Sequence, residues 1–116
     1  MNEEEIKELL GETEAELLQK IGMELIGKPA VPPSSEELEA EGRGWLRVHW
    51  NMLAEAICIN NTVITIMNMP KSLERDVQLV AAIGDLIFGI IVGVSPWTLS
   101  VLLVQTGVDK LCAKRN

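Results

Sequence analysis

The feature that most constrains this chain is an apolar run of 18 residues, 77–94, with the sequence VQLVAAIGDLIFGIIVGV. Thirteen of these residues are apolar, three are glycine, and only Gln78 and Asp85 are polar. The spacing predicts a helix that is apolar on almost every side. Such a helix has to be buried almost all round, so we expect it to lie at the centre of the fold.

The remaining segments also have helical periodicity, and together they predict an all-α protein. Serine residues mark the expected helix starts, with Ser34 or Ser35 before the second helix, Ser72 before the third and Ser95 before the fourth. The predicted helices are 3–26, 36–68, 72–94 and 96–113. The expected organisation is an acidic amphipathic helix in 1–27, a proline linker in 28–35, and an apolar bundle of three longer helices in 36–116.

Residues 57–66, ICINNTVITI, allow two interpretations. They are rich in β-branched residues, and Asn60–Asn61 is a plausible tight turn between two short strands. However, a heptad-like apolar seam runs from Leu46 to Met67 through Asn60 without interruption, which favours a helix. On that seam Asn60 either sets the register of an assembly or acts as a local capping residue.

The chain has more apolar surface than four helices alone are expected to cover, because the segment 46–67 is also apolar on two faces. Either another protein copy or a lipid bilayer would complete the burial. Gly89-x-x-x-Gly93 has the close-packing spacing of membrane helix pairs. Against a membrane hairpin, residues 96–108 would span only about 20 Å as a helix, and Asp85 in the bilayer would cost about 2.5–3.5 kcal/mol.

The sequence therefore favours a non-enzymatic assembly or adaptor module that acts through homo-oligomerisation or protein–protein contact. The alternative is a small membrane-associated helical hairpin with cytoplasmic termini. Asp85 is expected either on a narrow solvent-facing stripe or in an ion pair with an arginine. The predicted contact residues are large apolar side chains of these helices: Trp50, Ile64, Ile83, Ile87, Phe88, Ile91, Trp97 and Val101.

Charge argues against nucleic-acid binding. The net charge is −7, and it is uneven: residues 1–42 hold 12 acidic and 3 basic side chains, whereas residues 43–116 hold 5 acidic and 7 basic. Phosphate recognition needs lysine and arginine. With three tryptophans, one phenylalanine and no tyrosine, the chain also offers little for base stacking.

Nothing in the sequence predicts catalysis, a cofactor, a metal site or a small-molecule substrate. His49 is the only histidine, and Glu55 lies on a different helical face from it. The glutamates of residues 3–41 form no loop of alternating oxygen ligands around a glycine turn. Phosphate-binding, dinucleotide-binding, metalloprotease and nucleophile-elbow motifs are absent from the sequence.

The cysteines and the N-terminus lead to an expectation about location. Cys58 and Cys112 lie in apolar surroundings and are expected to be unpaired thiols in a reducing compartment, with a single disulfide as the alternative. The acidic start MNEEEIKELL does not resemble a signal or transit peptide. We expect a cytoplasmic protein, or in the membrane alternative a protein of the inner (cytoplasmic) membrane.

Overall fold

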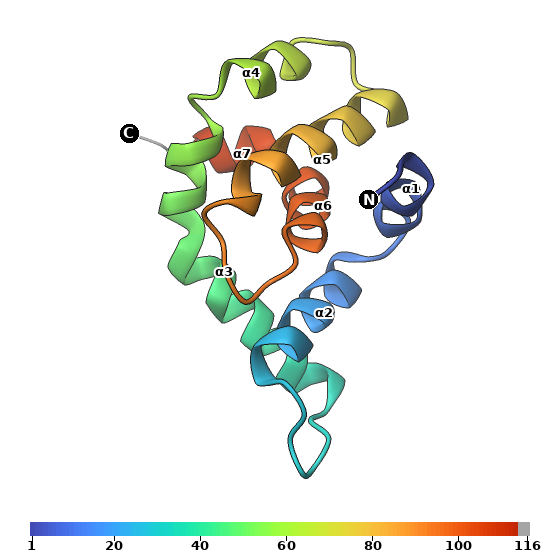
Figure 1. Ribbon diagram of the computed structural model, residues 1–116, viewed down its shortest axis with the longest axis vertical. Helices are drawn as coiled ribbons and strands as arrows, with labels where there is room; N and C mark the ends of the chain where they lie inside the picture. Colours follow the sequence, from blue (N-terminus) through green and yellow to red (C-terminus); the bar gives the residue numbers. More distant parts are fainter. Residues whose placement is uncertain (114–116) are drawn as a thin grey trace.

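Seven helices and no strand make up the residues that the structure describes, which are 1–113 in this computed structural model (Figure 1). The prediction of an all-α fold is therefore confirmed. The helices are α1 (Glu3–Leu10), α2 (Glu14–Ile26), α3 (Ser35–Ile57), α4 (Asn61–Met67), α5 (Leu73–Phe88), α6 (Pro96–Thr106) and α7 (Val108–Ala113).

The first six helices each begin at a polar capping residue. In every case the side-chain oxygen of the N-cap accepts a hydrogen bond from a backbone N–H in the first turn, which satisfies a donor that the helix itself leaves free. The capping residues are Asn2, Thr13, Ser34, Asn60, Ser72 and Ser95. The expected caps at Ser72 and Ser95 are thus confirmed, as is Pro96 in the first turn of α6.

Three of the predicted helices are interrupted, which corrects their expected bounds. α1 ends at Gly11 and the chain restarts at the Thr13 cap, so 3–26 is two helices. Asn60 caps a new helix within 36–68, where the alternative hairpin is also wrong because residues 61–67 are helical. Gly107 has a φ of 112°, which a helix cannot continue through, and it separates α6 from α7.

Thr13 and Glu16 form a capping box at the start of α2. The Thr13 hydroxyl accepts a hydrogen bond from the Glu16 backbone N–H at 3.1 Å, and the Glu16 carboxylate accepts one from the Thr13 backbone N–H at 3.0 Å. The hydrogen bonds from the backbone and then from the side chain of Thr13 hold the pKa of Glu16 below its ordinary value. The folded chain therefore favours the ionised carboxylate of Glu16 over its protonated form.

This capping box predicts a pH dependence of stability. Because the folded pKa of Glu16 is lowered, its contribution is present above the ordinary carboxyl pKa and is lost as the pH falls through the lowered value. Glu16→Gln is expected to be less stable than the parent at neutral pH, and the difference should shrink in acid. Urea unfolding of both chains across this range checks it, and a difference that does not vary with pH would contradict the assignment.

The centre of the molecule is α6, not the 77–94 segment that the sequence singled out. Every residue from Thr98 to Val104 is buried, so α6 is covered on all sides. It packs against α1, α2, α5 and α7, and it lies between them in Figure 1. The predicted helix 72–94 stops at Phe88, because Gly89 caps α5 and Gly93 adopts a φ of 89°.

Close contacts join α5 to α6. The Ser100 hydroxyl donates a hydrogen bond to the carbonyl oxygen of Val80 at 2.7 Å, which satisfies a polar group at the centre of the core. The indole of Trp97 lies directly over Gly84, where a β-carbon would overlap the ring. The glycine that permits close packing of α5 is therefore Gly84, whereas Gly89 and Gly93 have no neighbour within 4 Å of a β-carbon position.

α2 and α3 run in opposite directions and touch backbone to backbone. A β-carbon on Gly22 would overlap the carbonyl oxygen of Leu38, and one on Gly42 would overlap that of Leu18. Each helix thus contributes the same leucine-x-x-x-glycine pair to a reciprocal contact. The two glycines bring the helices closer together than any residue with a side chain would allow.

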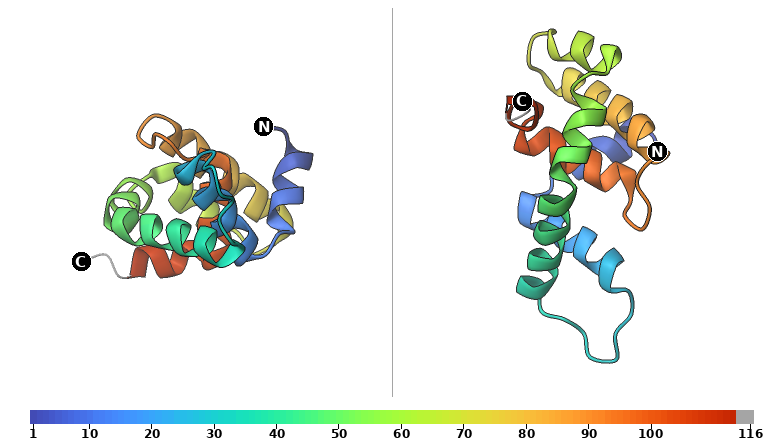
Figure 2. Two further views of the ribbon diagram at one scale, coloured as in Figure 1. Left: turned by 90° about the horizontal axis from the view of Figure 1, so that it is seen from below. Right: turned by 90° about the vertical axis from the view of Figure 1, so that its left-hand side faces the viewer.

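Residues of α1 and α2 belong to the same hydrophobic core as the rest of the chain. Leu17, Leu18 and Ile21 of α2 are buried in the cluster that contains α5 and α6. The proline segment reverses the direction of the chain, so that α3 returns along α2 (Figure 2). Gln105 of α6 also fixes the end of α1, donating hydrogen bonds to the carbonyl oxygens of Leu10 and Glu12 at 3.0 and 2.5 Å.

Candidate interaction surface

The most exposed run of large apolar side chains lies where α5 gives way to the loop that leads to α6. Phe88 is 68% exposed, Ile90 47% and Val92 91%. Their neighbours Ile87, Ile91 and Val94 are buried in the core. This alternation holds the segment on the protein while it directs three apolar side chains into solvent. We define Phe88, Ile90 and Val92 as the apolar loop.

The glycines explain why this loop does not stay helical. Gly89 and Gly93 bracket the β-branched residues 90–92, and both glycine and β-branched residues have lower helix propensity than alanine or leucine. In both views of Figure 2 the connection between α5 and α6 lies at the edge of the molecule. The surrounding chain therefore does not cover the apolar loop.

The structure divides the predicted contact residues into two groups. Ile83, Ile87, Ile91 and Val101 lie inside the core of the single chain and are not accessible to a partner in this conformation. The accessible ones are Phe88 and Ile64, which is 43% exposed. Trp50 and Trp97 are half-buried, and the ring of Trp97 covers Gly84. Half of the residues that were predicted to contact another copy are therefore buried within the core of a single chain.

The two predicted polar residues have local roles. The side chain of Asn60 accepts a hydrogen bond from the Val63 backbone N–H at 3.1 Å, so Asn60 is the N-cap of α4. Of the two roles that the sequence allowed for Asn60, this is the capping role. Asp85 is exposed on α5 and lines a shallow hollow with Asn60 and Thr62. Asp85 therefore faces solvent, which is one of the two arrangements that the sequence predicted.

His49 is held by Trp45, one turn earlier in α3. Its ring stacks on the Trp45 indole with centroids 4.1 Å apart. Its Nδ1 lies 2.8 Å from the Trp45 carbonyl oxygen, and because a carbonyl can only accept, Nδ1 carries the proton. A hollow of about 450 Å³ lies beside this pair, lined by Leu25, Glu41 and Val48 among others. Among residues 1–113, no cluster of three or more potential metal ligands is present.

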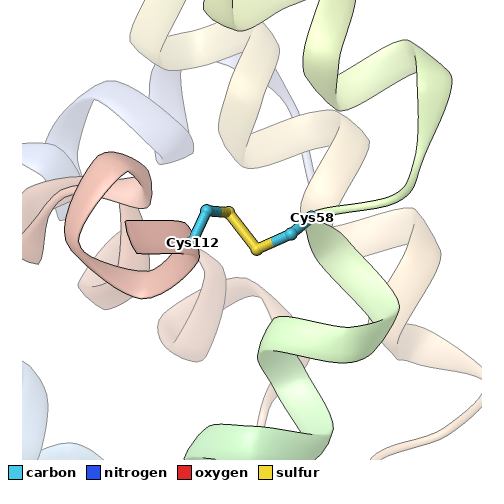
Figure 3. Close-up of a disulfide and its surroundings, with 2 residues drawn as sticks. All are labelled: Cys58 and Cys112. Atoms are coloured by element: carbon cyan, nitrogen blue, oxygen red, sulfur yellow. A yellow bond between two sulfur atoms is a disulfide. The ribbon is translucent and has the colours of Figure 1, made fainter. Parts of the chain in front are cut away.

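The expectation of two unpaired thiols is wrong. Cys58, at the end of α3, forms a disulfide with Cys112 of α7, with the Cα atoms 5.6 Å apart (Figure 3). The two residues are 54 positions apart, and the helical fold brings them together. Disulfides persist mainly in oxidising compartments. The argument for a cytoplasmic location that rested on free thiols therefore no longer applies, and that location stays a prediction.

No protein-family model, curated protein or solved structure matches this chain. None of the helices in the described part of the chain is both long and apolar enough to span a bilayer. The hairpin alternative depended on an unbroken helix through 77–94, and α5 ends at Phe88. Function therefore has to be argued from the surface of the fold.

The sequence did not predict that Ile90 and Val92 lie on the surface. Both were assigned to a central helix, in which their exposure would be unfavourable. The available signal was the segment GIIVG, in which two glycines enclose three β-branched residues shortly before Pro96. That composition is typical of a break between helices as much as of a helix interior.

Proposed function

We propose that this protein is a non-enzymatic helical assembly module that binds a second copy of itself through the apolar loop. The observation that carries the proposal is the exposure of Phe88, Ile90 and Val92 beside a core in which their neighbours are fully packed. Large apolar side chains grouped on a surface are typical of protein–protein contact. Aromatic residues are also enriched at such contacts.

Charge supports a second copy as the partner. Residues 1–42 carry 12 acidic and 3 basic side chains, while residues 43–116, which include the apolar loop, carry 5 acidic and 7 basic. Acidic residues of one copy can face basic residues of another at short range, while the net charge of −7 on each copy opposes association at long range and keeps it weak. Such complementarity steers association and restricts orientation.

The size of the apolar loop sets the expected strength. A stable interface buries about 800 Å² on each partner, and three side chains supply only part of that area. We therefore expect reversible association in the micromolar range. Association of this strength would appear as a concentration-dependent sedimentation coefficient.

The test is to remove the apolar loop without disturbing the core. Replacing Phe88, Ile90 and Val92 together by serine is expected to leave a monomer at concentrations where the parent chain associates. Val31→Ser is the matched control, because Val31 is 78% exposed but isolated in the proline segment. Sedimentation velocity over a series of concentrations measures the association. The proposal fails if the parent is monomeric throughout, or if the control loses association equally.

A further inference from the structure

The disulfide lies at the edge of the fold, where a small molecule can reach it. Cys58 and Cys112 are each half-buried, and both line an apolar groove of about 170 Å³. α4 contributes Val63, Ile64 and Met67 to this groove, and α7 contributes Val108. The bond therefore forms part of an open surface, in contrast to the buried contacts between α5 and α6.

α7 has few other attachments. It has six residues, and a helix this short is not stable by itself in water. It packs chiefly against α6 and α3, and its buried side chains are Val108 and Leu111. By contrast, α2, α5 and α6 contribute nine of the twelve largest fully buried side chains, whereas α7 contributes one, Leu111.

A pivot lies at the start of α7. Gly107 has a φ of 112°, a conformation that favours glycine, and only its neighbour Lys110 lies within 4 Å of a β-carbon position. Rotation of the chain at this point would carry α7 away from α3 and withdraw Val108 and Leu111 from the core. With the disulfide closed, Cys112 is held to the end of α3 as shown in Figure 3.

From this arrangement we propose that Cys58–Cys112 is a redox-controlled clasp, which holds α7 on the end of α3 when oxidised and releases it about Gly107 when reduced. The reductant is a dithiol. One of its thiolates attacks a cysteine sulfur, the protein S–S bond breaks, and a mixed disulfide forms. The second thiol of the reductant resolves it, so that two electrons and two protons pass to the protein and the reductant becomes a disulfide.

Release of α7 changes the surface of the molecule. Val108 and Leu111 leave their buried positions, and the groove beside Ile64 and Met67 loses one wall. The open form therefore presents more apolar surface at this edge than the closed form. This proposal does not depend on self-association through the apolar loop, which lies in a different segment of the chain.

Amide hydrogen exchange by mass spectrometry, before and after treatment with dithiothreitol, tests the clasp. The untreated protein should take up no thiol alkylating agent, and the reduced protein should take up two equivalents, one for each cysteine. Reduction should accelerate exchange in α7 by about tenfold or more, while α6 stays protected. Reoxidation with oxidised glutathione should restore the original pattern.

A double variant, Cys58→Ser with Cys112→Ser, serves as the control. It should show the fast α7 exchange without reductant, and dithiothreitol should then have no effect on it. Unchanged α7 exchange after reduction would overturn the proposal. So would equal acceleration in every helix, because the bond would then maintain the whole fold instead of one element, and circular dichroism distinguishes that case by loss of helix content.

Discussion

Replacing Gly22 by alanine is expected to destabilise the fold by about 3 kcal/mol, at the upper end of the usual cost of overpacking. The added β-carbon would overlap the carbonyl oxygen of Leu38. A backbone atom inside a helix cannot move aside as a flexible side chain can, so α2 and α3 have to separate. Gly42→Ala should have a similar effect, because its β-carbon would overlap the Leu18 carbonyl oxygen. Urea unfolding measures both.

Gly44→Ala provides the control within the same helix. Gly44 lies two positions beyond Gly42 in α3, but a β-carbon there has no neighbour within 4 Å. Alanine has the higher helix propensity, so this variant should gain about 0.5–1 kcal/mol. If Gly22→Ala and Gly44→Ala changed stability in the same direction, the close backbone contact between α2 and α3 would be wrong.

Leu102→Ala is expected to cost about 2–5 kcal/mol, the range for truncating a fully buried leucine. Leu102 lies in α6 with no exposed surface, where its side chain is enclosed by the helices around it. Removing three carbons there leaves a cavity that the surrounding helices cannot easily close. The free energy of unfolding from chemical denaturation gives the loss directly.

Phe88→Ala is the comparison for that measurement. It removes a larger side chain, but Phe88 is on the surface and should change stability by no more than about 0.5 kcal/mol. The ranking of the two variants tests which segment is central. A larger loss for Phe88→Ala than for Leu102→Ala would restore the 77–94 segment as the buried centre and contradict the position of α6.

The sequence was a good guide to where helices begin. A serine cap satisfies free backbone donors within a few residues, so Ser72 and Ser95 could be identified from local chemistry alone. It was a poorer guide to where helices end. The apolar pattern continues through Cys58, Gly89 and Gly107, and only the packing of the whole chain determines that it is interrupted there.

The sequence pattern also did not predict which helix is central. Thr98 and Ser100 of α6 are polar, and both are buried. In the fold, the Ser100 hydroxyl donates to the Val80 carbonyl and can therefore be buried at little cost. Glycine lowers helix propensity, so the local sequence gives no reason for Gly22 and Gly42 to lie within helices. Their role in the close contact becomes visible only when α2 and α3 are placed together.

The candidate site was predictable only in part. Phe88 and Ile64 were among the predicted contact residues, and both are exposed. The buried members of the predicted set have the same apolar character and helical spacing, so the sequence alone cannot separate contacts within a chain from contacts between chains. The disulfide joins residues 54 positions apart, and such a pairing depends on the folded arrangement.

Amide exchange in residues 89–93, measured at low and high protein concentration, tests the central claim most directly. We predict rapid exchange at Val92 and Gly93 in the dilute protein, because both residues are exposed and follow the last backbone hydrogen bonds of α5, which Ile90 and Ile91 donate to Ile87. In the concentrated protein we predict clear protection there, as the apolar loop of one copy is covered by another. Ala30 and Val31, the two residues of 29–33 that carry an amide hydrogen, should exchange at the same rate at both concentrations. Exchange in residues 89–93 that does not depend on concentration would contradict the account.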